Sequence, residues 1–97
     1  MRVIWSPLAL ERVNEIADYI AENNIEAATL FVLDVFGAVE RLKTFPNSGN
    51  VVPEVKRQNI REIIFKNYRV VYRVERKRVS ILTVRHGRQL LPLDEIK

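Results

Sequence analysis

Residues 59–86, with the sequence NIREIIFKNYRVVYRVERKRVSILTVRH, decide the fold of this chain. The segment is rich in Ile, Val, Tyr and Phe, which favour β-strands, and it is interrupted at Lys66-Asn67 and at Arg76-Lys77. Interruptions of two residues are typical of tight β-hairpins. The segment therefore predicts three consecutive antiparallel strands, at residues 59–66, 68–75 and 78–86.

Tight hairpins would also decide which side chains share a face of the sheet, because side chains alternate along a strand. Phe65 would lie opposite Tyr68, and Val74 opposite Val79. One face is then apolar enough to pack under helices, and it carries Ile63, Phe65, Tyr68, Val70, Tyr72, Val74, Val79, Ile81 and Thr83. The other face mixes aliphatic and charged side chains, and it carries Ile60, Glu62, Ile64, Arg69, Val71, Arg73, Arg78, Ser80, Leu82, Val84 and His86.

The first half of the chain predicts a short strand at residues 1–5 followed by two helices. Ser6-Pro7 is a helix start, since Ser can cap the first-turn amides and Pro is tolerated at the first helical position. Asn23-Asn24 ends the first helix and offers the cap of the second, and Phe45-Pro46 stops the second. Two apolar stripes with helical spacing mark them: Leu10, Val13, Ile16, Ala17 and Ile20, then Ala28, Phe31, Val32, Val35, Val39 and Leu42.

Together these elements predict a single α+β domain over residues 1–97, in which an antiparallel helical hairpin packs on one face of a mostly antiparallel sheet. Gly37 lies inside the second helix, where it costs up to about 1 kcal/mol relative to Ala. A close approach of another backbone would explain a glycine at that position.

The charge of the chain is divided unevenly along the sequence. Residues 1–53 hold four basic and seven acidic side chains, a balance of −3, whereas residues 54–97 hold twelve basic and five acidic ones, a balance of +7. This asymmetry points to an acidic partner for the second half, either nucleic acid or an acidic protein. The alternative is that Lys and Arg only solvate the outer face of the sheet.

Several function classes find no support in the sequence. Without cysteine there are no disulfides or thiolate metal sites, and the single histidine, His86, has no metal-spaced neighbours. The serines lack a nucleophile-elbow context, and the glycines form no phosphate-binding loop, so no cofactor is expected. No apolar run approaches the ~20 residues of a membrane span, and the cytoplasm is the simplest compartment.

Arg69 needs a partner, because it lies in the middle of the predicted central strand. Glu62, diagonal to it across the sheet, is the obvious carboxylate. One interpretation is a partly exposed ion pair worth about 0–1 kcal/mol. The other is a guanidinium on an open sheet face, available to a phosphate or a carboxylate. On the second interpretation we expect Arg69→Ala to keep the fold and to weaken the function of the chain, whereas a variant that melts many degrees lower would indicate a structural ion pair.

Five segments of the sequence, in this order and spacing, resemble the RelE/ParE superfamily of type II toxins. They are Val3-Ile4-Trp5-Ser6-Pro7; Leu42 and Phe45-Pro46 with Gly49; Ile60-Arg61-Glu62-Ile63; Asn67-Tyr68-Arg69-Val70-Val71-Tyr72-Arg73-Val74; and Ile81-Leu82-Thr83-Val84-Arg85-His86-Gly87-Arg88. The resemblance covers nearly the whole chain and implies the fold derived above. It also implies a cognate antitoxin, which we expect to hold the toxin with an amphipathic segment on the helical hairpin and sheet.

The superfamily divides by mechanism, and the departures of this chain favour one branch. RelE-like members cleave mRNA in the ribosomal A site, whereas ParE-like members poison DNA gyrase. Arg69 matches the arginine of the family's Tyr-Arg-x-x-Tyr strand, and Arg88 lies near a second RelE arginine. However, Ile60 and Glu62 stand where RelE-type enzymes carry lysines, and the C-terminal tail has no tyrosine. The resemblance therefore favours a ParE-like toxin, with a role in plasmid stabilization and gyrase as its target.

The residues expected to bind the target are basic side chains of the second half: Arg61, Arg69, Arg73, Arg85 and Arg88. Two alternatives stay open. A RelE-like ribosome-dependent mRNA endoribonuclease would use Arg69 and Arg88 for charge stabilisation, and His86 or Glu62 as acid or base. A non-toxic relic would still bind its antitoxin.

Overall fold

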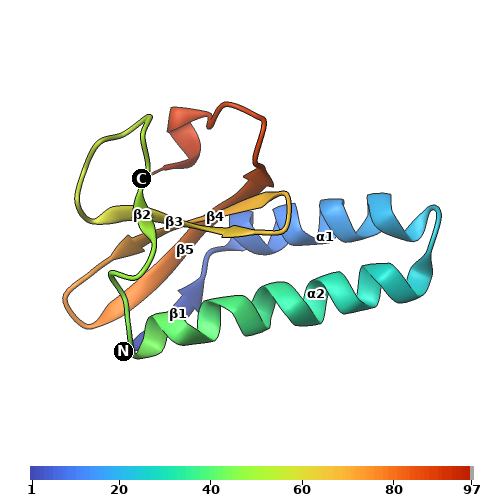
Figure 1. Cartoon of the computed structure of the whole chain (residues 1–97), viewed down its shortest axis with the longest axis horizontal. Coiled ribbons are helices and arrows are strands. Elements are labelled where there is room, and N and C mark those ends of the chain that lie inside the picture. The colour runs from blue at the N-terminus through green and yellow to red at the C-terminus, as the bar shows by residue number, and fades with distance from the viewer. Residues whose placement is uncertain (97) are drawn as a thin grey trace.

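A computed structural model describes residues 1–96 of the chain, and it places two helices on one face of a five-stranded sheet (Figure 1). The elements are β1 (Arg2–Trp5), α1 (Pro7–Ala21), α2 (Ile25–Val39), the 3₁₀ helix η1 (Glu40–Lys43), β2 (Asn50–Val51), β3 (Ile60–Phe65), β4 (Tyr68–Val74), β5 (Arg78–His86) and the 3₁₀ helix η2 (Leu93–Glu95). The strand order is β1-β5-β4-β3-β2. β1 pairs with β5 in parallel, and the other neighbours are antiparallel. The predicted α+β architecture is confirmed, with β2 as an additional short edge strand.

Side-chain caps begin both helices where the sequence predicted them. The Ser6 hydroxyl accepts a hydrogen bond from the backbone N–H of Ala9 at 3.0 Å, and the Asn24 amide oxygen accepts one from Ala27 at 3.0 Å. Each cap satisfies one of the donors that a helix start leaves without an internal partner. α1 and α2 run antiparallel, and their connecting turn reaches past the sheet (Figure 1).

A β-bulge between β4 and β5 changes the predicted faces of β5. The pairings Val74↔Val79 and Phe65↔Tyr68 are as predicted, but Tyr72 pairs with Ile81 while Val71 pairs with Thr83, so Leu82 is an extra residue. An extra residue reverses the faces beyond it. The sequence prediction is therefore wrong for three residues: Val84 and His86 lie on the helix face, and Thr83 lies on the outer face.

The sheet is covered on both faces. Between the helices and the sheet, one core cluster contains Ala9, Val13, Phe31, Val35, Val39, Leu42, Ile63, Val70, Tyr72, Val79, Ile81 and Val84. On the outer face a smaller cluster contains Val52, Ile60, Val71, Leu82 and Leu91, with Val55 and Ile96 packed against it. The C-terminal tail thus supplies the outer cover, together with the loop after β2.

Gly49 allows β2 to approach β3 closely. Its N–H donates to the hydroxyl of the fully buried Tyr72 at 2.9 Å. A Cβ on Gly49 would lie 2.5 Å from that hydroxyl and 2.5 Å from the backbone oxygen of Glu62. Both neighbours are fixed in the sheet, so the loop before β2 would have to move away.

We expect Gly49→Ala to lower the free energy of unfolding by about 3 kcal/mol, through overpacking and loss of the Tyr72 hydrogen bond. Gly37→Ala is the matched control, since a Cβ there would meet nothing within 4 Å. It should raise the free energy of unfolding by up to about 1 kcal/mol. Urea denaturation of the two variants measures both values, and equal effects would contradict this account of Gly49.

Candidate target-binding site

Arg69 lies in a buried ion triad. Its side chain is almost fully buried on the outer face, where Nε donates to Oε1 of Glu62 at 2.7 Å. Its two terminal nitrogens donate to the carboxylate of Glu54 at 2.7 and 2.8 Å. The predicted partner Glu62 is confirmed, but the expectation of an exposed pair or an open guanidinium is wrong. Glu54, which comes from the loop after β2, was not predicted as a partner of Arg69.

Two carboxylates in the structure tie the C-terminal tail to the rest of the fold. Besides binding Arg69, Glu54 accepts the backbone N–H of Leu91 at 3.3 Å. Glu95 accepts hydrogen bonds from Arg12 of α1 at 2.8 Å, from Thr83 at 2.7 Å, and from Arg85. Arg85 therefore has a structural partner that the sequence did not predict.

These contacts perturb both carboxylates in the same direction. Hydrogen bonds from Arg69 hold the pKa of Glu54 at about 2. Burial alone would raise the pKa of Glu95, but hydrogen bonds from Arg85, Arg12 and Thr83 outweigh it and lower that pKa to about 2. Each carboxylate is thus held in its ionised form by the folded chain.

The fold should consequently lose stability in acid. Both carboxyl groups have a folded pKa below the ordinary value of 4.5, so their contribution is complete above that pH and is lost as the pH falls toward 2. We expect a decrease of about 2–5 kcal/mol between pH 6 and pH 2.5, measured by urea denaturation at each pH. Glu95→Gln should be less stable at pH 6 and show a flatter profile. Glu11→Gln, at an exposed position, is the control. If its pH profile of stability were flattened as much as that of Glu95→Gln, the assignment of the acid effect to Glu95 would be contradicted.

Arg61 and Arg73 also have partners within the chain. Arg61 donates to the backbone oxygen of Gly49, just before β2, at 2.8 Å and to that of Gln58, just before β3, at 3.0 Å. It therefore links the start of β2 to the end of the loop that follows it. Arg73 lies beside Glu75, with 3.8 Å between Nε and the carboxylate oxygen. Four of the five predicted target-binding arginines are therefore engaged in the fold.

Arg88 is the exception. It is exposed, and within residues 1–96 its guanidinium takes part in no hydrogen bond or ion pair. Its backbone N–H donates to Nδ1 of His86 at 3.2 Å, which fixes the turn after β5. The fold therefore leaves this guanidinium available to a partner.

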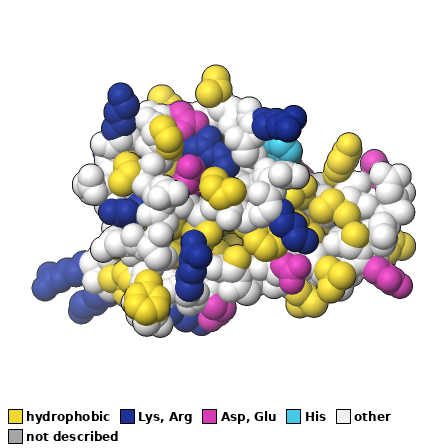
Figure 2. Space-filling view, viewed as in Figure 1, with side chains coloured by type: hydrophobic (Ala, Val, Ile, Leu, Met, Phe, Trp, Pro, Cys, Tyr) yellow, Lys and Arg dark blue, Asp and Glu magenta, His cyan; other side chains and the backbone are white. Residues whose placement is uncertain are grey.

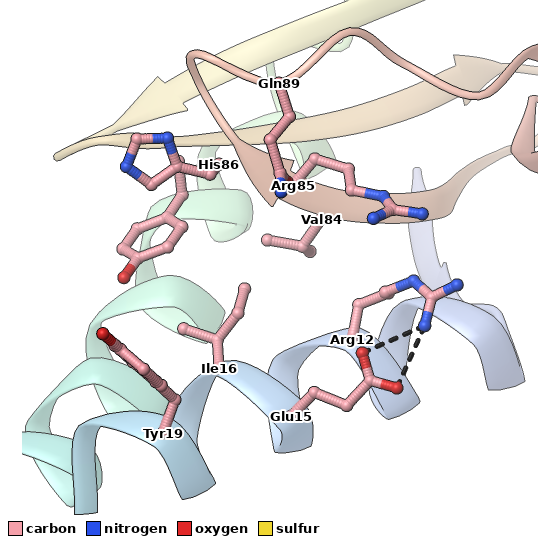
Figure 3. Close-up of a pocket in the computed structure, with 9 residues that line it drawn as sticks. Arg12, Glu15, Ile16, Tyr19, Val84, Arg85, His86 and Gln89 are labelled. Atoms are coloured by element: carbon pink, nitrogen blue, oxygen red, sulfur yellow. Dashed lines mark hydrogen bonds and ion pairs between the residues drawn. The ribbon is translucent and has the colours of Figure 1, made fainter.

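His86 separates two surface hollows at the end of β5. The first, of about 280 Å³, lies between α1 and β5 and is lined by Arg12, Glu15, Ile16, Tyr19, Tyr68, Val84, Arg85, His86 and Gln89 (Figure 3). The rings of Tyr68 and His86 meet edge to face there, with 5.7 Å between centroids. The second hollow, of about 260 Å³, is lined by Ile64, Lys66, Asn67, His86, Gly87 and Arg88.

We call the residues around the second hollow the β5 end, defined as Ile64, Lys66, His86, Arg88 and the neighbouring Leu90. Ile64 is 55% exposed and Leu90 85% exposed. Figure 2 shows Lys or Arg side chains beside the single histidine. The β5 end thus combines exposed cations with exposed apolar side chains, a composition suited to recognising another protein.

The structure brings together only part of the set predicted for RNA cleavage. His86 and Arg88 share the second hollow, whereas Arg69 and Glu62 are paired with each other on the outer face. Sequence reasoning missed Lys66 and the other exposed cations between residues 54 and 87, which are Lys56, Arg57, Arg76, Lys77 and Arg78. Lys66, Arg76 and Lys77 occupy the two-residue turns, where side chains face solvent, and that signal was available in the sequence.

Residues 3–91 match the family described as "ParE toxin of type II toxin-antitoxin system, parDE". The chain belongs to the ParE toxin family. "Putative toxin Y4kP" of Sinorhizobium fredii (strain NBRC 101917 / NGR234) is 34% identical over 93 residues, which cover 94% of this chain and 93% of that protein. The structure "Chromosomal ParDE TA system from P. aeruginosa" matches the fold of this ParE-family chain with a TM-score of 0.74. That match has 24% identity and covers 89% of this chain and 95% of the other.

Membership of the ParE family implies an antitoxin partner, because the family is described as the toxin of a type II toxin–antitoxin system. Among the described residues, no helix is long and apolar enough to cross a membrane. The same part of the ParE-family chain contains no group of three His, Asp or Glu side chains placed to hold a metal ion.

Proposed function

We propose that this chain is a toxin that inhibits growth by binding DNA gyrase in the cytoplasm, and that its antitoxin neutralises it by direct contact. The observation that carries the proposal is the position of Arg69. Its guanidinium is shared between Glu54 and Glu62, so a scissile phosphate would have to displace two carboxylates from it. A binding mechanism makes no such demand on Arg69.

The chemistry of RNA cleavage supports the same choice. Attack by a 2′-hydroxyl requires a base, an acid and charge stabilisation, and each well-placed acid or base contributes roughly 10²–10⁴-fold. Glu62 is 8% exposed and paired with Arg69, so it is unsuited to proton transfer with an RNA substrate. A nuclease would have to rely on His86, Arg88 and Lys66 at the β5 end. Their proximity keeps RNA cleavage as the second candidate function.

The β5 end is suited to protein binding. Arg88 supplies a guanidinium without an ion-pair partner among residues 1–96, and Ile64, which lines the same hollow, supplies exposed apolar area. Arg is favoured at protein interfaces, since its planar guanidinium can pair with carboxylates in two contacts. An acidic region of gyrase is the expected counterpart, and opposite charge accelerates such an encounter.

Two assays on one preparation test the target. The chain is added to a translating extract, with primer extension across the message, and separately to gyrase with relaxed plasmid and ATP. We expect intact messages together with stalled supercoiling or cleaved plasmid. Codon-specific cuts with normal supercoiling, abolished by His86→Ala, would establish the nuclease instead. No effect in either assay would favour a non-toxic relic.

The antitoxin is expected to cover the β5 end and the hollow between α1 and β5 with an acidic amphipathic segment. That hollow offers Tyr19, which is 71% exposed, beside Tyr68 and His86. Co-expression with the adjacent small gene should yield a complex that survives gel filtration and no longer inhibits gyrase. Separate elution of the two proteins at micromolar concentration would contradict this part of the proposal.

A further inference from the structure

The outer side of α2 is apolar although it faces solvent. Only two of the fifteen residues of α2, Glu26 and Asp34, are charged. The core side of α2 buries Ala28, Phe31, Val35 and Val39. At 100° per residue, Leu30, Leu33 and Gly37 fall within one narrow arc on the opposite side. Leu30 is 57% exposed and Leu33 63% exposed. We call these three residues the α2 stripe.

Gly37 has no role in the fold of its own chain. A Cβ there would meet nothing within 4 Å, whereas a Cβ on Gly49 would collide with the sheet. The backbone of Gly37 is helical, so no unusual dihedral angle requires glycine. A glycine in a helix interior costs about 1 kcal/mol relative to Ala. The benefit that offsets this cost therefore comes from outside the chain, and a notch between exposed leucines is suited to a close helix contact.

The charges around the α2 stripe leave one pair of residues unmatched. Asp34 lies 3.8 Å from Lys66, and Glu40 lies 2.7 Å from Lys43. Within the described chain, Glu26 at the start of α2 and Arg41 just after its end form no ion pair or side-chain hydrogen bond. Fifteen residue steps of about 1.5 Å each separate them by about 22 Å along the helix, so they do not meet in one molecule.

We propose that the α2 stripe is a homodimer interface, in which the α2 helices of two copies pack antiparallel about a two-fold axis. An antiparallel register centred between Leu33 and Asp34 places Leu30 of each copy over the Gly37 notch of the other. The same register brings Glu26 of each copy to Arg41 of the other, at both ends of the interface. A self-complementary surface of this kind closes as a dimer and does not propagate into a filament.

Four features select a second copy as the occupant. One register and one two-fold axis bring Leu30 to the Gly37 notch and Glu26 to Arg41, so the exposed leucine, the notch and the charges all gain a partner. Beyond this, the local charges balance, because three acidic side chains (Glu26, Asp34 and Glu40) face three basic ones (Arg41, Lys43 and Lys66). The Asp34–Lys66 contact places the middle of α2 beside the β5 end, so the dimer borders the proposed gyrase-binding surface.

Sedimentation velocity of the purified full chain over a micromolar concentration series tests the proposal. The wild-type chain should shift from monomer to dimer as concentration rises. Gly37→Leu fills the notch and should weaken association by about tenfold or more, while the variant stays folded. Gly37→Ala should raise the free energy of unfolding of the monomer and yet weaken the dimer. It therefore separates the effect on helix stability from the effect on association.

A charge-reversal cycle identifies the register. Glu26→Arg and Arg41→Glu should each weaken association, and the double variant should restore it, since the pair is re-formed with exchanged charges. Glu11→Arg, an equal charge change on the exposed side of α1, should have no effect. A chain that stays monomeric, or a dimer insensitive to Gly37→Leu and to the cycle, would overturn the proposal. Loss of antitoxin binding in Gly37→Leu without any self-association would assign the stripe to the antitoxin instead, and would also overturn it.

Discussion

Arg69→Ala should lower the free energy of unfolding by about 3–5 kcal/mol, enough to leave much of a domain of this size unfolded at 37 °C. The substitution leaves Glu62, which is 8% exposed, as a buried charge without its partner. It also frees Glu54, whose pKa of about 2 depends first on hydrogen bonds from Arg69. The loop after β2 and the tail at Leu91 then lose a shared anchor.

The control for Arg69 removes the two most buried charges of the triad, Arg69 and Glu62, together and leaves the partly exposed Glu54 in place. Arg69→Met with Glu62→Leu puts apolar side chains of similar size on the outer face, where Val71 and Leu82 already form a small core. Replacing a complete buried pair in this way is often neutral, so the double variant should recover most of the lost stability. Thermal and urea denaturation measure both variants. If Arg69→Ala were as stable as the wild type, the buried triad would be contradicted and the exposed Arg69–Glu62 pair expected from the sequence would be supported.

Arg88→Glu should leave stability unchanged and weaken gyrase inhibition by about tenfold or more. Its guanidinium is exposed and has no partner in the described chain, so the fold loses nothing when it is reversed. At an interface with an acidic partner, however, a like charge replaces an attraction with a repulsion. The readout is the toxin concentration that halves supercoiling, compared at two salt concentrations.

Arg76→Glu is the matched control for Arg88→Glu. It makes the same charge change on an exposed arginine, but in the turn between β4 and β5, at the other end of the sheet. The control should inhibit gyrase nearly as well as the wild type. Equal losses in both variants would show that only total charge matters, and the β5 end would lose its special role.

The predictable part of this fold came from local patterns. Two-residue turns predicted the pairings Phe65↔Tyr68 and Val74↔Val79, and Ser6 and Asn24 predicted the helix starts. These features depend on residues close in sequence, which is why a single sequence reveals them. The bulge at Leu82 left no comparable mark, because its residues are ordinary strand formers. Because the bulge shifts the register by one residue, the sequence prediction placed His86 on the wrong face of the sheet.

The candidate site was harder to predict, because its partners come from distant segments. Glu62 could be assigned to Arg69 from strand pairing, but Glu54 reaches it from an irregular loop. Glu95 likewise binds Arg85 from a tail segment with weak structural signals. The number of arginines in the sequence therefore led to an overestimate of the cations available to a target. Four of the five predicted target-binding arginines have partners within the chain. Arg88 was identified correctly as an accessible charge, and its part in target binding stays a prediction.

Direct binding of the purified chain to purified gyrase, measured by calorimetry with and without added salt, is the most immediate test of the central claim. We expect saturable binding that weakens as salt rises, is largely lost in Arg88→Glu, is retained in Arg76→Glu, and disappears when the antitoxin is present. Absence of binding at the concentrations that arrest growth, together with cleaved messages in the same cells, would contradict the claim.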